Sequence, residues 1–318
     1  MAVTVTLAAT LSLLGPRVRP SRRRAAVASS SATGELRGLL QMARLKNVPM
    51  GAALVAFGAY GARHAPPRPP TMVASQLVLG VATTTIVTTG SMLINDYHDW
   101  RGGVDTAETK PGRPLVTGEV RPETVKLVLK WGYALHLTLL CLVEPAALRL
   151  LVLANTLLTY LYSVHLKPVT GVKNAVCAGI ISMALGLGAV ARAAGDGLHP
   201  LRAVWRPLAA VAGLIWHREV LMDIEDVEGD AAAGVRTLPV ALGVGAAARL
   251  ALAPLLAAAA AAASAGGARG ALASSSLLLT GALAVRAQLG GFAPALLTQA
   301  IELSPFLLLV ALSALTSA

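Results

Sequence analysis

Two acidic segments are the parts of this sequence best equipped for chemistry. The later one runs from Met222 to Leu238 and places five carboxylates within eight residues. The earlier one runs from Asn95 to Asp105 and contains three aspartates. Both follow apolar runs that could sit in a bilayer, where a carboxylate is costly and therefore commonly functional. The two segments predict a site that binds cations.

The spacing within each segment predicts one oxygen-bearing face at a helix end. Asn95 and Asp99 lie about 40° apart on a helix. Gly102 and Gly103 are expected to end that helix, so Asp105 should return from a loop.

The later segment repeats the pattern with three aspartates at i, i+3 and i+7. Asp223, Asp226 and Asp230 fall within about 60° of one another if the helix continues through them. Each of the two helix ends is therefore expected to present a row of carboxylates.

Hard oxygen ligands without histidine or thiolate favour Mg²⁺, which proteins bind through one or two carboxylates together with substrate phosphate oxygens. Cations placed around such ions would suit the outer oxygens of a polyanion. The candidates are Lys110, Arg113, Lys167, Lys173, Arg218 and Arg236. A diphosphate is the ligand that would use both the acidic rows and these cations.

Other interpretations of the acidic segments have to be weighed. A single acidic loop on a membrane protein is most often a solvated face, and a catalytically silent scaffold would need no more than that. A soluble prenyl diphosphate synthase also pairs acidic segments, but its helices alternate apolar and polar faces. A transporter would place ionisable residues near mid-bilayer rather than at helix ends.

The elements that must position these residues are apolar helices. The chain has 318 residues, of which 55% are hydrophobic and 14% charged, against about 25% charged in soluble domains. We therefore predict an all-α, polytopic membrane protein. Nine spans are expected, near residues 48–61, 72–94, 125–143, 148–164, 174–194, 201–221, 244–263, 271–284 and 293–315.

Nine spans in this order would collect the polar chemistry on one membrane face. The loops after the second, fourth and sixth spans contain the first acidic segment, then Lys167 and Lys173, then the second acidic segment. The acidic ends also lie four spans apart, which suggests two four-helix halves plus a ninth helix around a central cavity, as internal repeats in membrane proteins can give.

The rest of the sequence gives weaker indications, which concern location, binding partners and the two cysteines. Residues 1–33 are rich in arginine and serine and contain no acidic residue, which predicts an organellar transit peptide, chloroplast favoured over mitochondrion. The net charge of +11 is spread among apolar segments, which fits lipid headgroups and an anionic substrate rather than nucleic acid. Cys141 and Cys177 are interpreted as packing residues.

With these motifs in view, residues 40–318 resemble the UbiA-type intramembrane prenyltransferase superfamily. Its first motif is matched by Asn95, Asp96, Asp99, Asp105 and the turn from Lys110 to Leu115. Its second motif is matched by Asp223, Asp226, Asp230 and the segment from Gly234 to Pro239. Asn47 resembles a residue on the acceptor side, and the segment from Tyr162 to Asn174 resembles the family's lysine-bearing loop.

One spacing departs from the usual pattern. Most branches place the third aspartate eight residues after the asparagine, where this chain has Gly103, and Asp105 comes at ten. That spacing resembles the naphthoate branch, whereas the second motif is closer to the archaeal-lipid and 4-hydroxybenzoate branches.

The resemblance implies Mg²⁺ as cofactor, held by Asn95, Asp99, Asp226 and Asp230, and a prenyl diphosphate as donor. Asp96, Asp105 and Asp223 would help with ligation or proton removal. The expected acceptor is lipophilic and aromatic, of the quinone or tocopherol type. The alternatives are a glycerol lipid or chlorophyllide as acceptor and, in another class, a membrane transporter with acidic ion sites.

Overall fold

A computed structural model describes residues 32–167, 169–232 and 234–317. Its described residues form helices joined by short loops, and they contain no strand beyond an isolated bridge between Pro67 and Ala193. The all-α prediction is confirmed. The predicted transit peptide, residues 1–33, lies almost wholly outside the described residues and stays a prediction.

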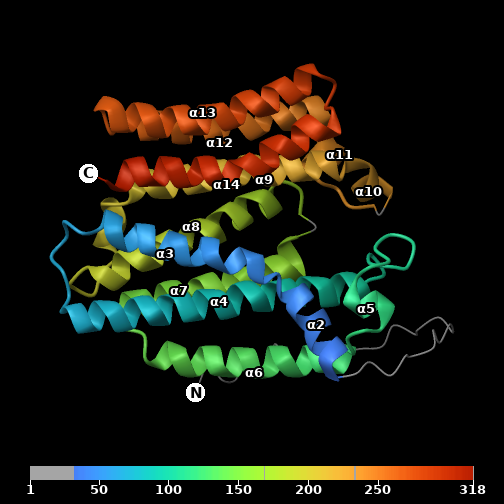
Figure 1. Ribbon diagram of the computed structural model, residues 1–318, viewed down its shortest axis with the longest axis horizontal. Helices are drawn as coiled ribbons and strands as arrows, with labels where there is room; N and C mark the ends of the chain where they lie inside the picture. Colours follow the sequence, from blue (N-terminus) through green and yellow to red (C-terminus); the bar gives the residue numbers. More distant parts are fainter. Residues whose placement is uncertain (1–31, 168, 233, 318) are drawn as a thin grey trace.

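The long helices make up most of the molecule (Figure 1). In the described residues, those of 14 residues or more are α3 (Val48–Gly61), α4 (Pro70–Arg101), α6 (Pro122–Cys141), α7 (Ala146–Leu161), α8 (Val172–Arg192), α9 (Trp205–Glu225), α12 (Val244–Ala263), α13 (Gly267–Leu289) and α14 (Pro294–Thr316). The shorter elements are α2 (Ala32–Ala43), η1 (Leu45–Asn47), α5 (Pro114–Thr117), η2 (Tyr162–Leu166), η3 (His199–Arg202), α10 (Val227–Ala232) and α11 (Leu238–Leu242).

Six helices of the described chain are long and apolar enough to cross a membrane: α4, α7 continued by η2, α8, α12, α13 and α14. The prediction of a polytopic membrane fold is confirmed, whereas the predicted count of nine spans is not. The 14 residues of α3 extend only about 21 Å, less than the roughly 30 Å of a hydrocarbon core. In α9, the last two turns carry the charged Arg218, Glu219 and Asp223.

The helices run up and down, so alternate helix ends meet at the same end of the bundle. Figure 1 shows α4, α7 and α9 ending on the side where α2, α5, α10 and α11 gather, with the C-terminus at the other end. The prediction that both acidic segments and the lysine loop share one face is therefore confirmed.

The first helices of the two predicted halves cross each other at glycines. A Cβ on Gly58 of α3 would lie 1.8 Å from the Leu185 carbonyl oxygen, and one on Gly188 of α8 would lie 1.8 Å from the Val55 carbonyl oxygen. The contact is reciprocal, because each glycine lies against the backbone of the other helix. Only glycine allows backbones to approach this closely.

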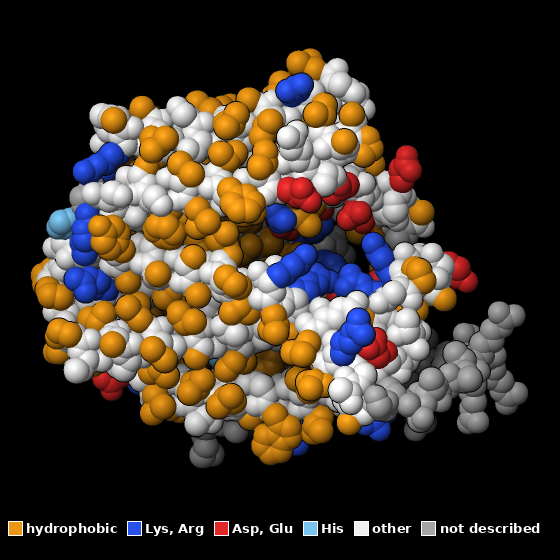
Figure 2. Space-filling view, in the orientation of Figure 1, with side chains coloured by type: hydrophobic (Ala, Val, Ile, Leu, Met, Phe, Trp, Pro, Cys, Tyr) orange, Lys and Arg blue, Asp and Glu red, His pale blue; other side chains and the backbone are white. Residues whose placement is uncertain are grey.

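The outer surface along the helices is apolar, which suits contact with lipid tails. Large exposed side chains include Val78, Trp131, Leu150 and Phe306. Figure 2 shows hydrophobic side chains scattered along the bundle, whereas charged side chains concentrate at its ends. A surface of this kind is costly in water and favourable in a bilayer.

Two helix boundaries near the acidic segments matter for the site. α4 continues to Arg101, seven residues past the expected span, so Asn95 to Asp99 are helical; the helix ends at Gly102, as predicted. α9 ends at Glu225, and Asp226 is its C-cap residue. The predicted single helix through Asp223, Asp226 and Asp230 is therefore wrong, because Asp230 belongs to the separate helix α10.

Candidate functional site

The first cluster forms where α4 reaches the polar end. Asp96 is buried, with 4% of its side chain exposed. It accepts a hydrogen bond from Arg44 Nη2 at 2.9 Å and from Arg113 Nη1 at 3.1 Å. Arg44 lies in the left-handed region, with φ 47°, at the turn between α2 and η1. A buried carboxylate with two guanidinium partners is a charge-neutralised anchor at the helix end.

Asp105 returns to this cluster from the loop after α4, as predicted. Its backbone N–H donates to the Asp99 carbonyl oxygen at 3.1 Å, and its carboxylate lies 3.7 Å from Arg113 Nε. Burial raises the pKa of the Asp105 carboxyl, and the charge of Arg113 opposes that rise. Arg113 thus joins both buried aspartates, and it adopts this role from the turn just before α5.

Asp99, at the same helix end, has a lysine as its partner, and Asn95 lies one turn before it. Lys167 Nζ lies 2.8 and 2.7 Å from the two carboxylate oxygens of Asp99. One turn earlier, the Oδ1 atom of Asn95 is buried without a hydrogen-bond partner among the described residues. A buried oxygen acceptor of this kind suits a cation bound next to Asp99.

The second cluster lies at the end of α9 against the start of α8. Asp223 is buried and accepts hydrogen bonds from Lys173 Nζ and, at 3.0 Å, from Asn174 Nδ2. Lys173 and Asn174 both come from the first turn of α8. This pair of donors fixes the carboxylate toward the α8 side of the bundle.

The other two aspartates of the second segment are more open. Asp226 is exposed, and Asp230 is half-buried. The Asp230 backbone N–H donates to the Asp226 carbonyl oxygen at 2.9 Å, which keeps the two residues close despite the break between α9 and α10. Burial raises the pKa of the Asp230 carboxyl, and the charge of Lys173 opposes this.

The segment between α7 and α8 joins the two clusters. Lys167 pairs with Asp99 of the first, and Lys173 pairs with Asp223 of the second. Tyr162, at the start of the π-helical turn η2, lies within electrostatic reach of Asp99 and Asp223. Figure 2 shows the bundle hollowed at this end, with Lys and Arg side chains along the hollow and acidic side chains beside it.

The structure brings most of the predicted site residues together, but not all of them. The residues in direct contact across elements are Asp96, Asp99, Asp105, Arg113, Lys167, Lys173, Asn174 and Asp223. Asn47, Lys110 and Arg236 are exposed. Arg218 donates to Met222 Sδ at 3.1 Å and lies 3.7 Å from Glu219, on its own helix.

Two residues of the site were missed by the sequence interpretation. Arg44 reaches Asp96 across 52 positions, and nothing in its local spacing indicates that contact. Glu219 is largely buried one turn before Asp223. Its i and i+4 relation to Asp223 is visible in the sequence and could have signalled a shared face.

The residues present fit Mg²⁺ by their chemistry. In the described part of the chain, no three acidic, histidine or cysteine side chains converge closely enough to hold a metal ion. The carboxylates are instead neutralised by lysine and arginine. Asn95 Oδ1, without a partner, and the open Asp226 and Asp230 are the oxygens that could receive a cation.

The described residues form a helical bundle with paired acidic clusters and a basic loop at one end. A model for the UbiA prenyltransferase family matches residues 50–316, and the chain belongs to that family. It is therefore an integral membrane protein and a transferase, and the predicted superfamily is confirmed.

Named relatives and solved structures extend this result. Digeranylgeranylglyceryl phosphate synthase of Methanopyrus kandleri is 34% identical over 219 residues, covering 68% of this chain and 73% of the relative. A solved structure concerned with digeranylgeranylglyceryl phosphate synthase in membranes has a TM-score of 0.67 at 20% identity, covering 89% of this chain and 97% of that one. A UbiA homologue from Archaeoglobus fulgidus bound to DMAPP and Mg²⁺ has a TM-score of 0.61 at 18% identity, covering 88% and 100%.

These relatives correct the predicted acceptor. An aromatic acceptor of the quinone or tocopherol type was the expectation, but curated relatives from Methanopyrus kandleri and Halobacterium salinarum are named as glycerol-lipid synthases. The naphthoate-like spacing of Asp105 is therefore no guide to the acceptor in this chain.

Proposed function

We propose that the protein transfers an isoprenoid chain, of the geranylgeranyl class, from its diphosphate to a hydroxyl group of a prenylated glycerol phosphate. The observation that carries the proposal is the name shared by the relatives, digeranylgeranylglyceryl phosphate synthase. A paired acidic and basic site at one membrane face supports it, because such a site can grip a diphosphate while the apolar chain lies among the helices.

The donor diphosphate would lie between the two clusters. We propose that Asn95, Asp99, Asp226 and Asp230 hold Mg²⁺, as the UbiA homologue bound to DMAPP and Mg²⁺ suggests. Mg²⁺ supplies charge neutralisation of the diphosphate oxygens. In this arrangement, Lys167 and Lys173 leave their carboxylate partners and turn toward the diphosphate. Arg113 and the buried Asp96 and Asp105 keep the end of α4 in place.

Bond cleavage follows from these contacts. The C–O bond of the donor ionises as Lys167, Lys173 and Arg236 stabilise the negative charge on the leaving diphosphate. Helix packing keeps water from the allylic cation, and the acceptor hydroxyl attacks it. Tyr162, within reach of both clusters, would border the reacting carbon. An organellar destination set by residues 1–33 remains a prediction.

An assay matrix tests the proposal. Purified protein in lipid with Mg²⁺ is given geranylgeranyl diphosphate and one acceptor at a time: prenylated glycerol phosphate, homogentisate, 4-hydroxybenzoate, dihydroxynaphthoate or chlorophyllide. We expect an ether product with the glycerol phosphate alone. A product with any other acceptor and none with the glycerol phosphate would contradict the proposed function.

Substitution of the proposed Mg²⁺ ligands tests the site within the same assay. Asp99→Ala and Asp226→Ala should each reduce transfer by at least about 100-fold, because charge stabilisation of the leaving group is lost. Asp196→Ala, an exposed aspartate between α8 and η3 at the opposite end, is the control and should retain activity. Full activity in both site variants would refute the assignment of these ligands.

A further inference from the structure

A second layer of polar side chains lies beneath the Lys173 and Asp223 pair. Glu219 precedes Asp223 by four residues on α9, and Cys177 follows Lys173 by four residues on α8. Residues at i and i+4 share a helix face and stand about 6 Å apart along the axis. Because α8 and α9 pack side by side, this layer continues the site toward the bilayer interior.

The carboxylate of Glu219 is largely enclosed, with 15% of its side chain exposed. The Cys177 thiol neighbours it across the contact between α8 and α9. Arg218 Nη1 is 3.7 Å away, beyond ordinary hydrogen-bond distance, and it donates to Met222 Sδ instead. Glu219 therefore has the Cys177 thiol and, at 3.7 Å, the Arg218 guanidinium as its neighbours.

Charged and titratable groups near Glu219 come from α8, from α9 itself and from the end of α7. Lys173 on α8 and Asp223 on α9 lie above it, and Tyr162 approaches from the end of α7. The layer is thus bordered on its upper side by residues assigned to the diphosphate and on its lower side by apolar helix. A carboxylate at such a depth is a functional candidate by default, because leaving it there without a use is costly.

The proposed reaction needs a proton acceptor at this depth. A hydroxyl oxygen that attacks an allylic carbon becomes a positively charged oxonium until its proton leaves. The carbon that is attacked adjoins the diphosphate, and the diphosphate would lie at Lys173 and Asp223. Glu219 lies about one helical turn further in, on the same helix face, where the acceptor hydroxyl must approach.

We infer that Glu219 is the proton acceptor for the hydroxyl of the acceptor lipid, an inference that rests on the proposed function. The donor C–O bond breaks with its electron pair leaving on the diphosphate. A lone pair of the hydroxyl oxygen forms the new C–O bond, and the O–H electron pair stays on that oxygen as the proton passes to Glu219. The products are an ether, diphosphate and a protonated Glu219, which returns its proton to water at the polar end.

Glu219→Gln tests this role, because glutamine keeps the shape of the side chain but accepts a proton poorly. We expect ether formation to fall by at least about 100-fold, the usual contribution of a general base. Slow solvolysis of geranylgeranyl diphosphate to the free alcohol, measured without acceptor, should persist, as should thermal stabilisation by donor and Mg²⁺. The acidic limb of the kcat/KM profile against pH should disappear.

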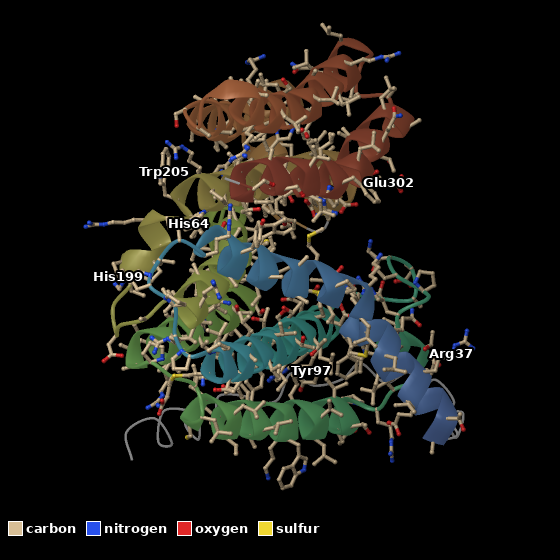
Figure 3. The ribbon with its side chains drawn as sticks, turned by 60° about the vertical axis from the view of Figure 1, so that its left-hand side comes forward. Arg37, His64, Tyr97, His199, Trp205 and Glu302 are labelled. Carbon is tan, nitrogen blue, oxygen red and sulfur yellow. The ribbon has the colours of Figure 1, made fainter. Side chains whose placement is uncertain are left out.

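The matched control is Glu302→Gln, an exposed glutamate on α14 whose position is marked in Figure 3. It should retain transfer and the pH profile of the native protein. Glu219→Asp keeps a carboxylate and should transfer slowly with the acidic limb intact. If Glu219→Gln does not fold, Glu219→Asp becomes the decisive variant. Loss of the acidic limb of its kcat/KM profile would then overturn the inference.

Three outcomes would overturn the assignment. Transfer by Glu219→Gln within threefold of native shows that no proton acceptor was removed. Joint loss of transfer and donor solvolysis shows that Glu219 serves the diphosphate instead. If the native protein prenylates aromatic acceptors and never the glycerol phosphate, the proposed function fails first, and the inference falls with it.

Discussion

Each buried aspartate of the site is held by a cation from another part of the chain. Asp96 contacts Arg44 and Arg113, whereas Asp223 contacts Lys173. A buried charge without a partner is costly, and the pairs avoid that cost when no substrate is bound. In the proposed function, Lys167 and Lys173 would exchange a carboxylate for a phosphate oxygen when the donor binds.

Loss of Arg113 should disturb two ion pairs of the first cluster at once. Arg113→Gln removes a partner from both Asp96 and Asp105. We expect a destabilisation of roughly 1–3 kcal/mol, below the 3–5 typical of a broken buried pair because about a third of Arg113 is exposed. Thermal unfolding in detergent measures it.

The control for this change is Arg37→Gln. Arg37 is an exposed residue of α2, and Figure 3 marks its position at the polar end. The substitution Arg37→Gln removes the same charge as Arg113→Gln and should leave the unfolding temperature unchanged. Equal stability of the two variants would show that Arg113 does not compensate the buried aspartates.

Sequence spacing found the acidic residues but could not find all of their partners. Asn95, Asp99 and Asp105 follow from helix periodicity and two glycines. Arg44 could not be assigned, because its contact with Asp96 depends on the left-handed turn after α2. The acceptor was misassigned because the sequence interpretation rested on motif residues whose spacing matches more than one branch of the family.

Among the elements, α2 packs on the polar end through Met42 and is also attached there by one acidic residue. Glu35 accepts hydrogen bonds from Arg121 at 3.1 Å and from Thr124 at 2.6 Å, near the start of α6. These contacts lower the pKa of Glu35 from its model-compound value of 4.5 to about 2, with the Arg121 hydrogen bond as the largest cause. α2 ends at Ala43 and is followed by Arg44, which contacts Asp96.

The attachment of α2 should therefore depend on pH. A carboxyl with a lowered pKa in the folded state stabilises that state fully above about pH 4.5, and the contribution disappears as the pH falls toward 2. We expect amide hydrogen exchange in α2, corrected for intrinsic rates, to accelerate across this window. In Glu35→Gln the exchange should be fast already at pH 7 and independent of pH. A slow, unchanged α2 in that variant would refute the attachment.

The crossing of α3 and α8 gives an element-scale test with a built-in control. Gly188→Ala forces a methyl group against the Val55 carbonyl, and overpacking of this kind costs about 1–3 kcal/mol or more. Gly179→Ala lies on the same helix with nothing within 4 Å of the added methyl, and it should be neutral or slightly stabilising. Thermal unfolding of both variants decides, and equal stability would contradict the close crossing.

At the scale of the whole molecule, the alternating direction of successive helices correctly predicted one polar face. The number of membrane crossings was predicted less well. Within the described residues, length and apolarity identify six crossing helices, because α3 is short, α6 carries Lys126 and Lys130, and α9 is charged near its end. Two of these three exceptions have a further physical reason. α3 is packed against α8 and α4, and α9 carries the second acidic cluster. The segments that build a site inside a membrane are those that hydropathy identifies least well.

The sidedness can be measured with single cysteines. In a background with Cys141→Ser and Cys177→Ser, a cysteine placed at Glu108 or Glu228 should react with an impermeant maleimide from one side of sealed vesicles. One placed at Asp196 should react from the other side, because it lies beyond the opposite end of α8. Labelling of all three from the same side would refute the arrangement of the helices.

The reciprocal glycine contact also determines how the two halves can move. Backbones that touch cannot approach further or slide easily, so relative motion is restricted to rotation about that point. Gly188 lies 15 residues beyond Lys173 along α8, a lever arm of about 22 Å. A rotation of about 5° would therefore move one acidic cluster relative to the other by about 2 Å. If the donor binds as proposed, a small tilt about this contact would be enough to change the spacing of the two clusters around the diphosphate.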